Sequence, residues 1–191
     1  MRRMTRTATA VTTAMAVVAL LAGAASASVG AAKSKEVSAE KYAKAVCGAY
    51  NSTNSGYEDL SSGYQALPVD DPATFQSDAA ALADEFVATI EQQIAKLKKI
   101  YPDAEDGKKV GKLFVADLQT YIDKVEEATT KFRAADASGV AFQGDVIQFE
   151  TALQILDVGA SDPFREVDDQ DLIGAFDDEK SCAEVVQVFG G

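Results

Sequence analysis

The sequence predicts an all-α protein: an antiparallel, up-and-down four-helix bundle with a short helical C-terminal cap that a disulfide attaches. Three observations predict this fold. Apolar residues recur at three- and four-residue steps in four stretches between residues 38 and 159. About three to eight residues connect neighbouring stretches, and such short connections place consecutive helices antiparallel. No alternating pattern of comparable length indicates a β-strand.

Residues 1–27 have the three parts of a secretory signal peptide. Three arginines form the basic start, residues 14–22 form the apolar run, and residues 25–27 form an A-x-A cleavage site. A retained membrane anchor is the alternative, but the apolar run is shorter than the roughly 20 residues that a span needs. We therefore expect cleavage, no membrane insertion afterwards, and a secreted or extracytoplasmic (cell envelope) location. Residues 28–37 are expected to be flexible, and residues 38–191 to form a single domain.

The first two helices are predicted from apolar stripes that follow capping residues. Ser38 is the expected N-cap of the first helix, whose stripe covers residues 42–67. Asp71 is the expected N-cap of the second helix. Pro72 suits the first turn of that helix, because proline lacks an N–H group that would have no helical partner there. The second stripe continues to Pro102, where we expect the helix to end.

The third and fourth helices are predicted from stripes over residues 110–132 and 142–156. The remaining tail predicts two short helices, at about residues 169–176 and 181–188, with Ser181 as the N-cap of the second. Apolar residues in this tail are available to pack on the bundle. We therefore expect the tail to be a cap within the same domain.

Cys47 and Cys182 are the only cysteines in the chain. An even pair in an exported protein typically forms a disulfide, because the compartment is oxidising. A redox-active pair would be expected at C-x-x-C spacing, and two buried free thiols are the other alternative. The predicted topology agrees with a disulfide, since an up-and-down order returns the end of the fourth helix to the end of the bundle where the first begins.

The chain has a large excess of negative charge. It contains 30 acidic and 18 basic residues, for a formal net charge of −12, and removal of the three arginines with the signal peptide leaves −15. Such a surface repels nucleic acid and anionic lipid, so we expect no nucleic-acid partner. Cationic partners fit better, although the charge is also explained by the solubility of an exported protein.

The chain contains no histidine and no tryptophan, which excludes many kinds of active site. Ser-His and Cys-His nucleophiles, histidine-ligated zinc and an imidazole base all require histidine. Paired carboxylates remain, so a carboxylate-dependent hydrolase acting on an extracellular substrate is an alternative. The expectation is instead a non-catalytic binding or interaction protein of the cell envelope or medium, without a cofactor or metal. Its partner would be a protein or a small-molecule ligand outside the cytoplasm.

The predicted first helix contains a run of six poor helix formers at residues 51–56. A kink or break there would free backbone groups and open a pocket for a small polar or aromatic ligand. The candidate pocket residues are Tyr50, Asn51, Asn54, Tyr57 and Tyr64.

The three tyrosines among these candidates also have a purely structural interpretation. They recur at seven-residue intervals, beside a line of small residues at the same interval: Ala49, Gly56 and Gly63. The rings would then fill the core with their hydroxyls near its rim, and the small line would let a neighbouring helix approach closely.

Overall fold

The computed structural model describes residues 34–154, 163–183 and 185 of the 191-residue chain. The predicted signal peptide and its cleavage site lie outside the described residues. The elements in chain order are β1 (Lys35–Val37), α1 (Ala39–Gln65), α2 (Pro72–Leu97), β2 (Ile100–Pro102), α3 (Gly107–Ala134), α4 (Phe142–Gln154), the 3-10 helix η2 (Pro163–Glu166), α5 (Gln170–Asp178) and the 3-10 helix η3 (Lys180–Cys182).

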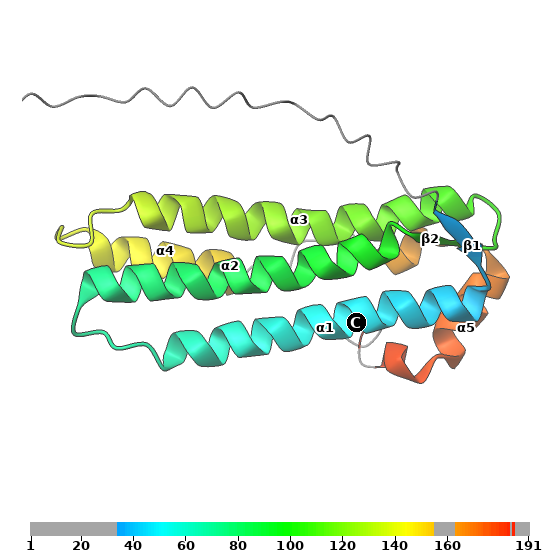
Figure 1. The fold of residues 1–191 in the computed structure, drawn as a ribbon, viewed down its shortest axis with the longest axis horizontal. Helices are drawn as coiled ribbons and strands as arrows, with labels where there is room; N and C mark the ends of the chain where they lie inside the picture. The colour runs from blue at the N-terminus through cyan, green and yellow to red at the C-terminus, as the bar shows by residue number, and fades with distance from the viewer. Residues whose placement is uncertain (1–33, 155–162, 184, 186–191) are drawn as a thin grey trace, which may run out of the picture. The chain divides into compact units, whose positions relative to one another are not determined.

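Most of the described chain is helical, as the sequence predicts, and consecutive helices from α1 to α4 run in opposite directions (Figure 1). α1 packs on α2, α2 on α3 and α3 on α4. The first three helices have 26 to 28 residues, and α4 has 13. None of the helices in the described ranges combines the length and the apolar character that crossing a membrane requires.

The starts of α1 and α2 follow the local sequence signals. The Asp71 carboxylate accepts hydrogen bonds from the backbone N–H groups of Ala73 and Thr74, at 3.1 and 3.3 Å. Pro72 is the first residue of α2, as predicted. Ser38 is the N-cap residue of α1, although its side chain makes no capping hydrogen bond. These boundaries are predictable because capping involves only residues within one helical turn.

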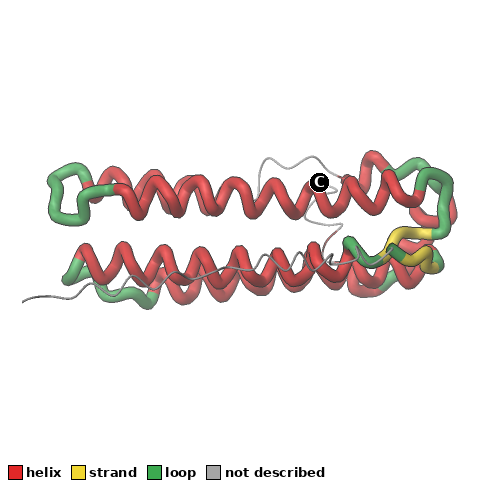
Figure 2. Tube along the Cα trace, turned by 45° about the horizontal axis from the view of Figure 1, so that its top comes forward, coloured by secondary structure: helices red, strands yellow, loops and turns green. Residues whose placement is uncertain are grey.

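A two-stranded parallel sheet at one end of the helices corrects the all-α prediction (Figure 2). Lys35 of β1 lies opposite Ile100 of β2, so β1 occupies part of the segment 28–37 that was expected to be flexible. α2 ends at Leu97, and β2 contains the last residues of the predicted second helix. Pro102 disfavours helical backbone in the residue before it, and strands of three residues are too short to show alternation.

Small residues on α1 let α2 approach closely, as the structural interpretation of the tyrosine pattern predicts. A Cβ atom at Gly56 would lie 3.2 Å from Cδ2 of Phe86, and one at Gly63 would lie 3.0 Å from Cδ2 of Leu82. Ala49, on the same line, is buried. Larger side chains at these positions would force the two helices apart or displace the facing side chains.

Aromatic side chains join the helices to one another and to the C-terminal segment. Phe132 of α3 stacks on Phe149 of α4, with ring centroids 4.4 Å apart. Phe114 of α3 lies among four other rings within 6.3 Å between centroids: Tyr42, Tyr50, Phe164 and Phe176. Such ring pairs stabilise the fold beyond the contribution of the apolar surface area that the rings bury.

The C-terminal segment is covalently attached to α1. Cys47 and Cys182 form the predicted disulfide, with their Cα atoms 5.0 Å apart and a sequence separation of 135. Both α5 and η3 pack against α1. The predicted Ser181 cap is wrong, because the Glu179 carboxylate is the acceptor: it binds the backbone N–H and the hydroxyl of Ser181, at 3.0 and 2.8 Å.

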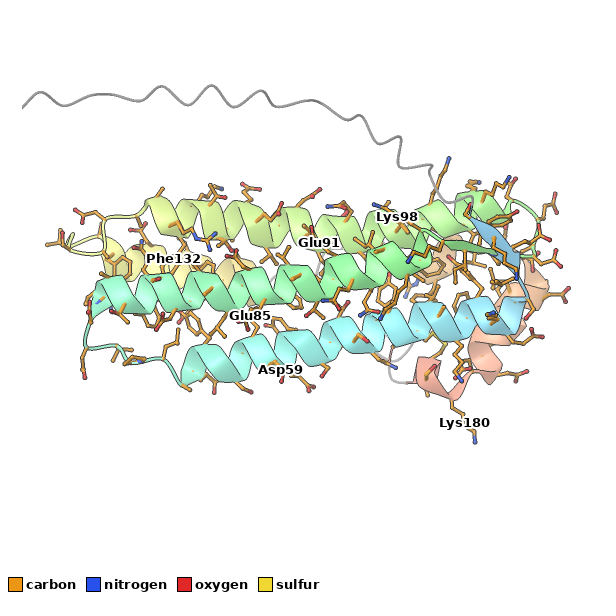
Figure 3. The ribbon with its side chains drawn as sticks, in the orientation of Figure 1. Asp59, Glu85, Glu91, Lys98, Phe132 and Lys180 are labelled. Carbon is orange, nitrogen blue, oxygen red and sulfur yellow. A yellow bond between two sulfur atoms is a disulfide. The ribbon has the colours of Figure 1, made fainter. Side chains whose placement is uncertain are left out.

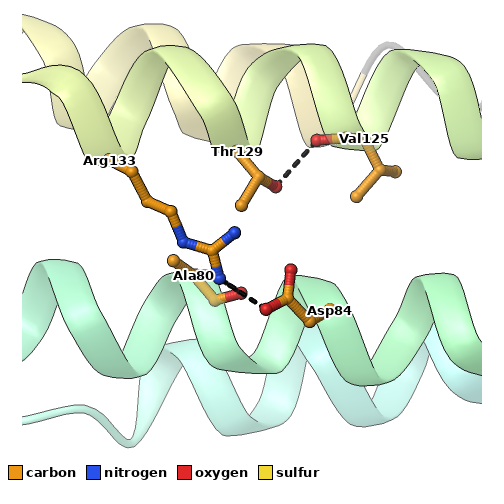
Figure 4. Close-up of polar contacts among 5 residues, drawn as sticks. All are labelled: Ala80, Asp84, Val125, Thr129 and Arg133. Carbon is orange, nitrogen blue, oxygen red and sulfur yellow. Dashed lines mark hydrogen bonds and ion pairs between the residues drawn. The ribbon is translucent and has the colours of Figure 1, made fainter. Parts of the chain in front are cut away.

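An exposed ion pair links α2 to α3. The Arg133 guanidinium pairs with the Asp84 carboxylate and donates to the backbone oxygen of Ala80 at 3.4 Å (Figure 4). One turn earlier, the Thr129 hydroxyl donates to the backbone oxygen of Val125 at 2.7 Å. Exposed ion pairs contribute little to stability, so apolar packing accounts for most of the association between these two helices.

Candidate functional site

α1 is a single α-helix from Ala39 to Gln65, so the predicted break at residues 51–56 is wrong. The Ser52 hydroxyl donates to the backbone oxygen of Gly48 at 2.8 Å, and the Thr53 hydroxyl donates to that of Ala49 at 3.0 Å. These side chains bond to carbonyls of their own helix instead of competing with it. Packing against α2 supplies the stability that the local sequence lacks, because tertiary contacts dominate helix stability in proteins.

Tyr50 is a core residue. Its side chain is 1% exposed, and its hydroxyl donates to Oδ2 of Asp117 on α3 at 2.6 Å. Burial raises the pKa of this phenol far above its usual value, and the charge and hydrogen bond of Asp117 raise it further. Tyr50 therefore stays protonated and joins α1 to α3 away from solvent.

The two candidate asparagines have different surroundings. Asn51 donates from Nδ2 to the backbone oxygen of Ser181 at 2.7 Å, close to the disulfide at Cys47. Asn54 is half-buried and is not among the residues that line the groove described next. Asn51 is thus a structural residue that holds η3 against α1.

The other two candidates, Tyr57 and Tyr64, line a groove of about 450 Å³ between α1 and α4. The rest of the lining comes from α1, the α1–α2 connection, the start of α2 and one face of α4: Leu60, Ser61, Gln65, Leu67, Val69, Phe75, Val146, Glu150 and Leu153. The structure therefore brings together two of the five predicted pocket residues. A groove of this size is within the usual range for small-molecule sites.

Aromatic rings form much of the wall of the α1–α4 groove. Tyr57 meets Phe86 edge to face, with ring centroids 6.1 Å apart. The ring centroid of Tyr64 lies 5.4 Å from that of Phe75 and 6.2 Å from that of Phe149. Because these rings are held by neighbours from α2 and α4, the apolar surface of the groove is already formed without a ligand.

Glu150 is the only charged residue among the described residues that line this groove. Burial raises the pKa of Tyr64, and the neighbouring Glu150 carboxylate raises it further. The Tyr64 hydroxyl oxygen is buried beside this carboxylate. A neutral phenol and a carboxylate therefore lie together at a surface that is otherwise mainly apolar.

Glu150 is not among the pocket residues predicted from the sequence, although its spacing is a signal for it. Val146, Glu150 and Leu153 are spaced at i, i+4 and i+7, so the carboxylate shares a face with the apolar stripe of α4. A carboxylate in such a stripe is notable because burial of a charge is costly. No comparable sequence signal predicts that Val69 and Phe75 line the same groove, because the α1–α2 connection places them there.

A two-carboxylate hydrolase requires two carboxyl groups about 5–9 Å apart on either side of the scissile bond, and among the described residues Glu150 is the only acidic one that lines the groove. Across the described ranges, no three His, Cys, Asp or Glu side chains group in a way that could hold a metal ion.

Comparisons with known proteins do not add to this description. No family model, curated protein or solved structure matches the chain. The geometry of its own residues is the basis for the function proposed below.

Proposed function

We propose that this chain is a secreted, non-catalytic binding protein that holds a small organic ligand in the α1–α4 groove. The observation that carries the proposal is the convergence of Tyr57, Tyr64 and Glu150 on one aromatic groove of about 450 Å³. Known small-molecule sites combine mostly apolar walls with a few polar groups that orient the ligand, and this groove has the same composition.

The polar groups of the groove favour an apolar or aromatic amine as the ligand. Its hydrocarbon body would pack on the rings of Tyr57 and Tyr64, and its ammonium group would donate to the Glu150 carboxylate. The excess of acidic residues over the whole chain also favours a cationic ligand, because it attracts cations and repels anions at a distance.

We infer that α1 to α4 form an up-and-down four-helix bundle in which the groove is the seam between the first and last helices. The packing of each helix on the next supports this arrangement, as does the 6.2 Å distance between the rings of Tyr64 and Phe149. Nuclear Overhauser effects between these two rings would test it. Secretion is supported by the signal-peptide pattern at residues 1–27, and the disulfide is compatible with an oxidising compartment.

The ligand class can be tested with three probes that share a phenyl ring and differ in charge. Phenethylamine, 2-phenylethanol and 3-phenylpropionate would be titrated into the oxidised mature protein by calorimetry, with thermal shift as a second measurement. We expect the amine to bind most tightly and the carboxylate most weakly, because only the amine can pair with Glu150. The substitution Glu150→Gln should remove the preference for the amine over the alcohol.

Two neighbouring substitutions on α4 would locate the site. Val146 lines the groove, so Val146→Trp should fill it and abolish binding of phenethylamine. Ile147 is 55% exposed and is not among the lining residues, so Ile147→Trp should change the affinity by less than about twofold. Equal effects of the two substitutions, or no binding of any probe to the parent protein, would contradict the proposal.

A further inference from the structure

A second groove, of about 480 Å³, lies between β2 and α3. Lys98, one of its lining residues, stands at the same end of the molecule as the two strands (Figure 3). The residues that line it are Ser34, Leu97, Lys98, Ile100, Tyr101, Lys108, Gly111, Lys112, Val115, Ala116 and Gln119. Three of these are lysines and none is acidic.

This basic groove contrasts with the chain as a whole, which has 30 acidic and 18 basic residues. Acidic side chains such as Asp59, Glu85 and Glu91 are exposed along α1 and α2 (Figure 3). A concave surface that gathers charge of one sign concentrates its potential, and this groove therefore attracts anions locally.

None of the three lysines of the groove belongs to an ion pair that the structure describes. Lys108 and Lys112 are four residues apart on α3, a spacing at which like charges destabilise a helix. The nearby Asp106 carboxylate pairs with Lys109 instead, at 3.9 Å. An anion bound between the lysines would relieve this repulsion.

The floor of the basic groove is apolar. Leu97 is buried, and Ile100, Tyr101 and Val115 are half-buried. The ammonium group of Lys108 lies 5.3 Å from the centroid of the Tyr101 ring, a cation–π contact that holds the lysine over this floor. A ligand that carries an apolar group would therefore find more contacts here than an inorganic ion.

We propose that the groove between β2 and α3 binds a small phosphate monoester that carries an apolar or aromatic group. Its phosphate oxygens accept hydrogen bonds from the ammonium groups of Lys98, Lys108 and Lys112, and its apolar group packs on Tyr101. A free small molecule fits better than a phospholipid in a bilayer, because the acidic surface elsewhere on the chain opposes approach to an anionic membrane.

The test compares two double substitutions that remove the same charge from the same helix. Lys108→Gln with Lys112→Gln changes the basic groove, and Lys124→Gln with Lys131→Gln changes lysines that line a different groove, between α3 and α4. Phenyl phosphate would be titrated into the oxidised mature protein and both variants by calorimetry at low ionic strength. We expect the first pair to weaken binding by about tenfold, and the control pair by less than about twofold.

Three further probes establish what the groove recognises: inorganic phosphate, phenol and phosphatidylserine vesicles. Inorganic phosphate and phenol should each bind more weakly than phenyl phosphate, since each lacks one half of the proposed ligand. Binding of inorganic phosphate as tight as that of phenyl phosphate would overturn the role of the apolar floor. Equal losses in the two double variants, no binding of phenyl phosphate, or binding only to phosphatidylserine vesicles would overturn the proposal.

Val146→Trp should leave phenyl phosphate binding unchanged, which separates this site from the α1–α4 groove.

Discussion

The hydroxyl of Tyr50 on α1 donates a 2.6 Å hydrogen bond to Asp117 on α3, and both residues are buried. The two positions are 67 residues apart in the sequence. Tyr42, also buried on α1, has a hydroxyl without a hydrogen-bond partner among the described residues. Both rings pack edge to face on Phe114. The chain therefore contains two buried phenols that differ mainly in whether the hydroxyl is bonded.

Removal of these two hydroxyls should have different effects on stability. Tyr50→Phe leaves Asp117 without this donor, and we expect a loss of about 2 kcal/mol in the free energy of unfolding. Tyr42→Phe removes a polar group with no described partner, so stability should change by less than about 0.5 kcal/mol or increase. Urea denaturation at neutral pH measures both. Equal losses would mean that the Tyr50–Asp117 bond contributes no more than an unbonded hydroxyl.

Stability should also fall at alkaline pH. Burial raises the pKa of Tyr42, Tyr50 and Tyr64 in the native state, whereas an unfolded tyrosine ionises at a pKa of about 10. Above that pH the unfolded chain has lost protons that the native chain retains, so stability decreases as pH rises. Each such tyrosine contributes a slope of up to about 1.4 kcal/mol per pH unit.

The measurement for this pH effect is the free energy of unfolding from pH 8 to 11. Tyr42→Phe removes one raised pKa and should flatten the alkaline decline relative to the parent protein. Since lysines also titrate in this range, the difference between the two curves is the informative quantity. Parallel curves would indicate that Tyr42 has the same pKa in the native and the unfolded protein.

Asn51 should hold the C-terminal segment in place. Asn51→Ala removes the hydrogen bond to the backbone oxygen of Ser181, and a bond of this kind contributes about 1 kcal/mol. Trypsin cleavage after the exposed Lys180 should then become about fivefold faster, as seen on reducing gels. Asn54→Ala, three residues along the same helix, is the matched control and should leave the rate unchanged. A faster rate in both variants would point to general weakening of α1.

Gly107 is required at the start of α3. A Cβ atom there would lie 2.0 Å from the backbone oxygen of Pro102. A backbone atom cannot move aside as the end of a flexible side chain can. Gly107→Ala should therefore destabilise the protein by about 1–3 kcal/mol. Gly48→Ala is the control, because nothing lies within 4 Å of its added Cβ and alanine favours a helix interior by about 0.5–1 kcal/mol. A neutral Gly107→Ala would show that β2 and α3 can move apart without cost.

The disulfide should contribute strongly to stability because it closes a long loop. For a sequence separation of 135, the chain-entropy model gives roughly 5 kcal/mol. The double substitution Cys47→Ala with Cys182→Ala should lower the free energy of unfolding by about this amount, and reduction of the parent protein should have a similar effect. An unchanged denaturation midpoint would show that the unfolded chain gains little freedom when the link is lost.

The sequence alone determined those features that depend on residues within a few turns of one another. The N-cap at Asp71, the approximate positions of the helices and the close approach of a neighbouring helix at Gly56 and Gly63 follow from capping and from regular spacing along one helix. The pairing of Cys47 with Cys182 followed from their number and the expected compartment.

Tertiary structure alone decided the features that depend on which faces meet. Packing on α2 keeps α1 intact through a run of poor helix formers, and no local rule measures that contribution. Contacts with different helices separate Tyr50, buried against Asp117 of α3, from Tyr57 and Tyr64, which line a groove with α4, although all three repeat every seven residues. Pairing of β1 with β2 requires segments on either side of α1 and α2 to meet, because hydrogen bonds between strands join distant parts of a chain.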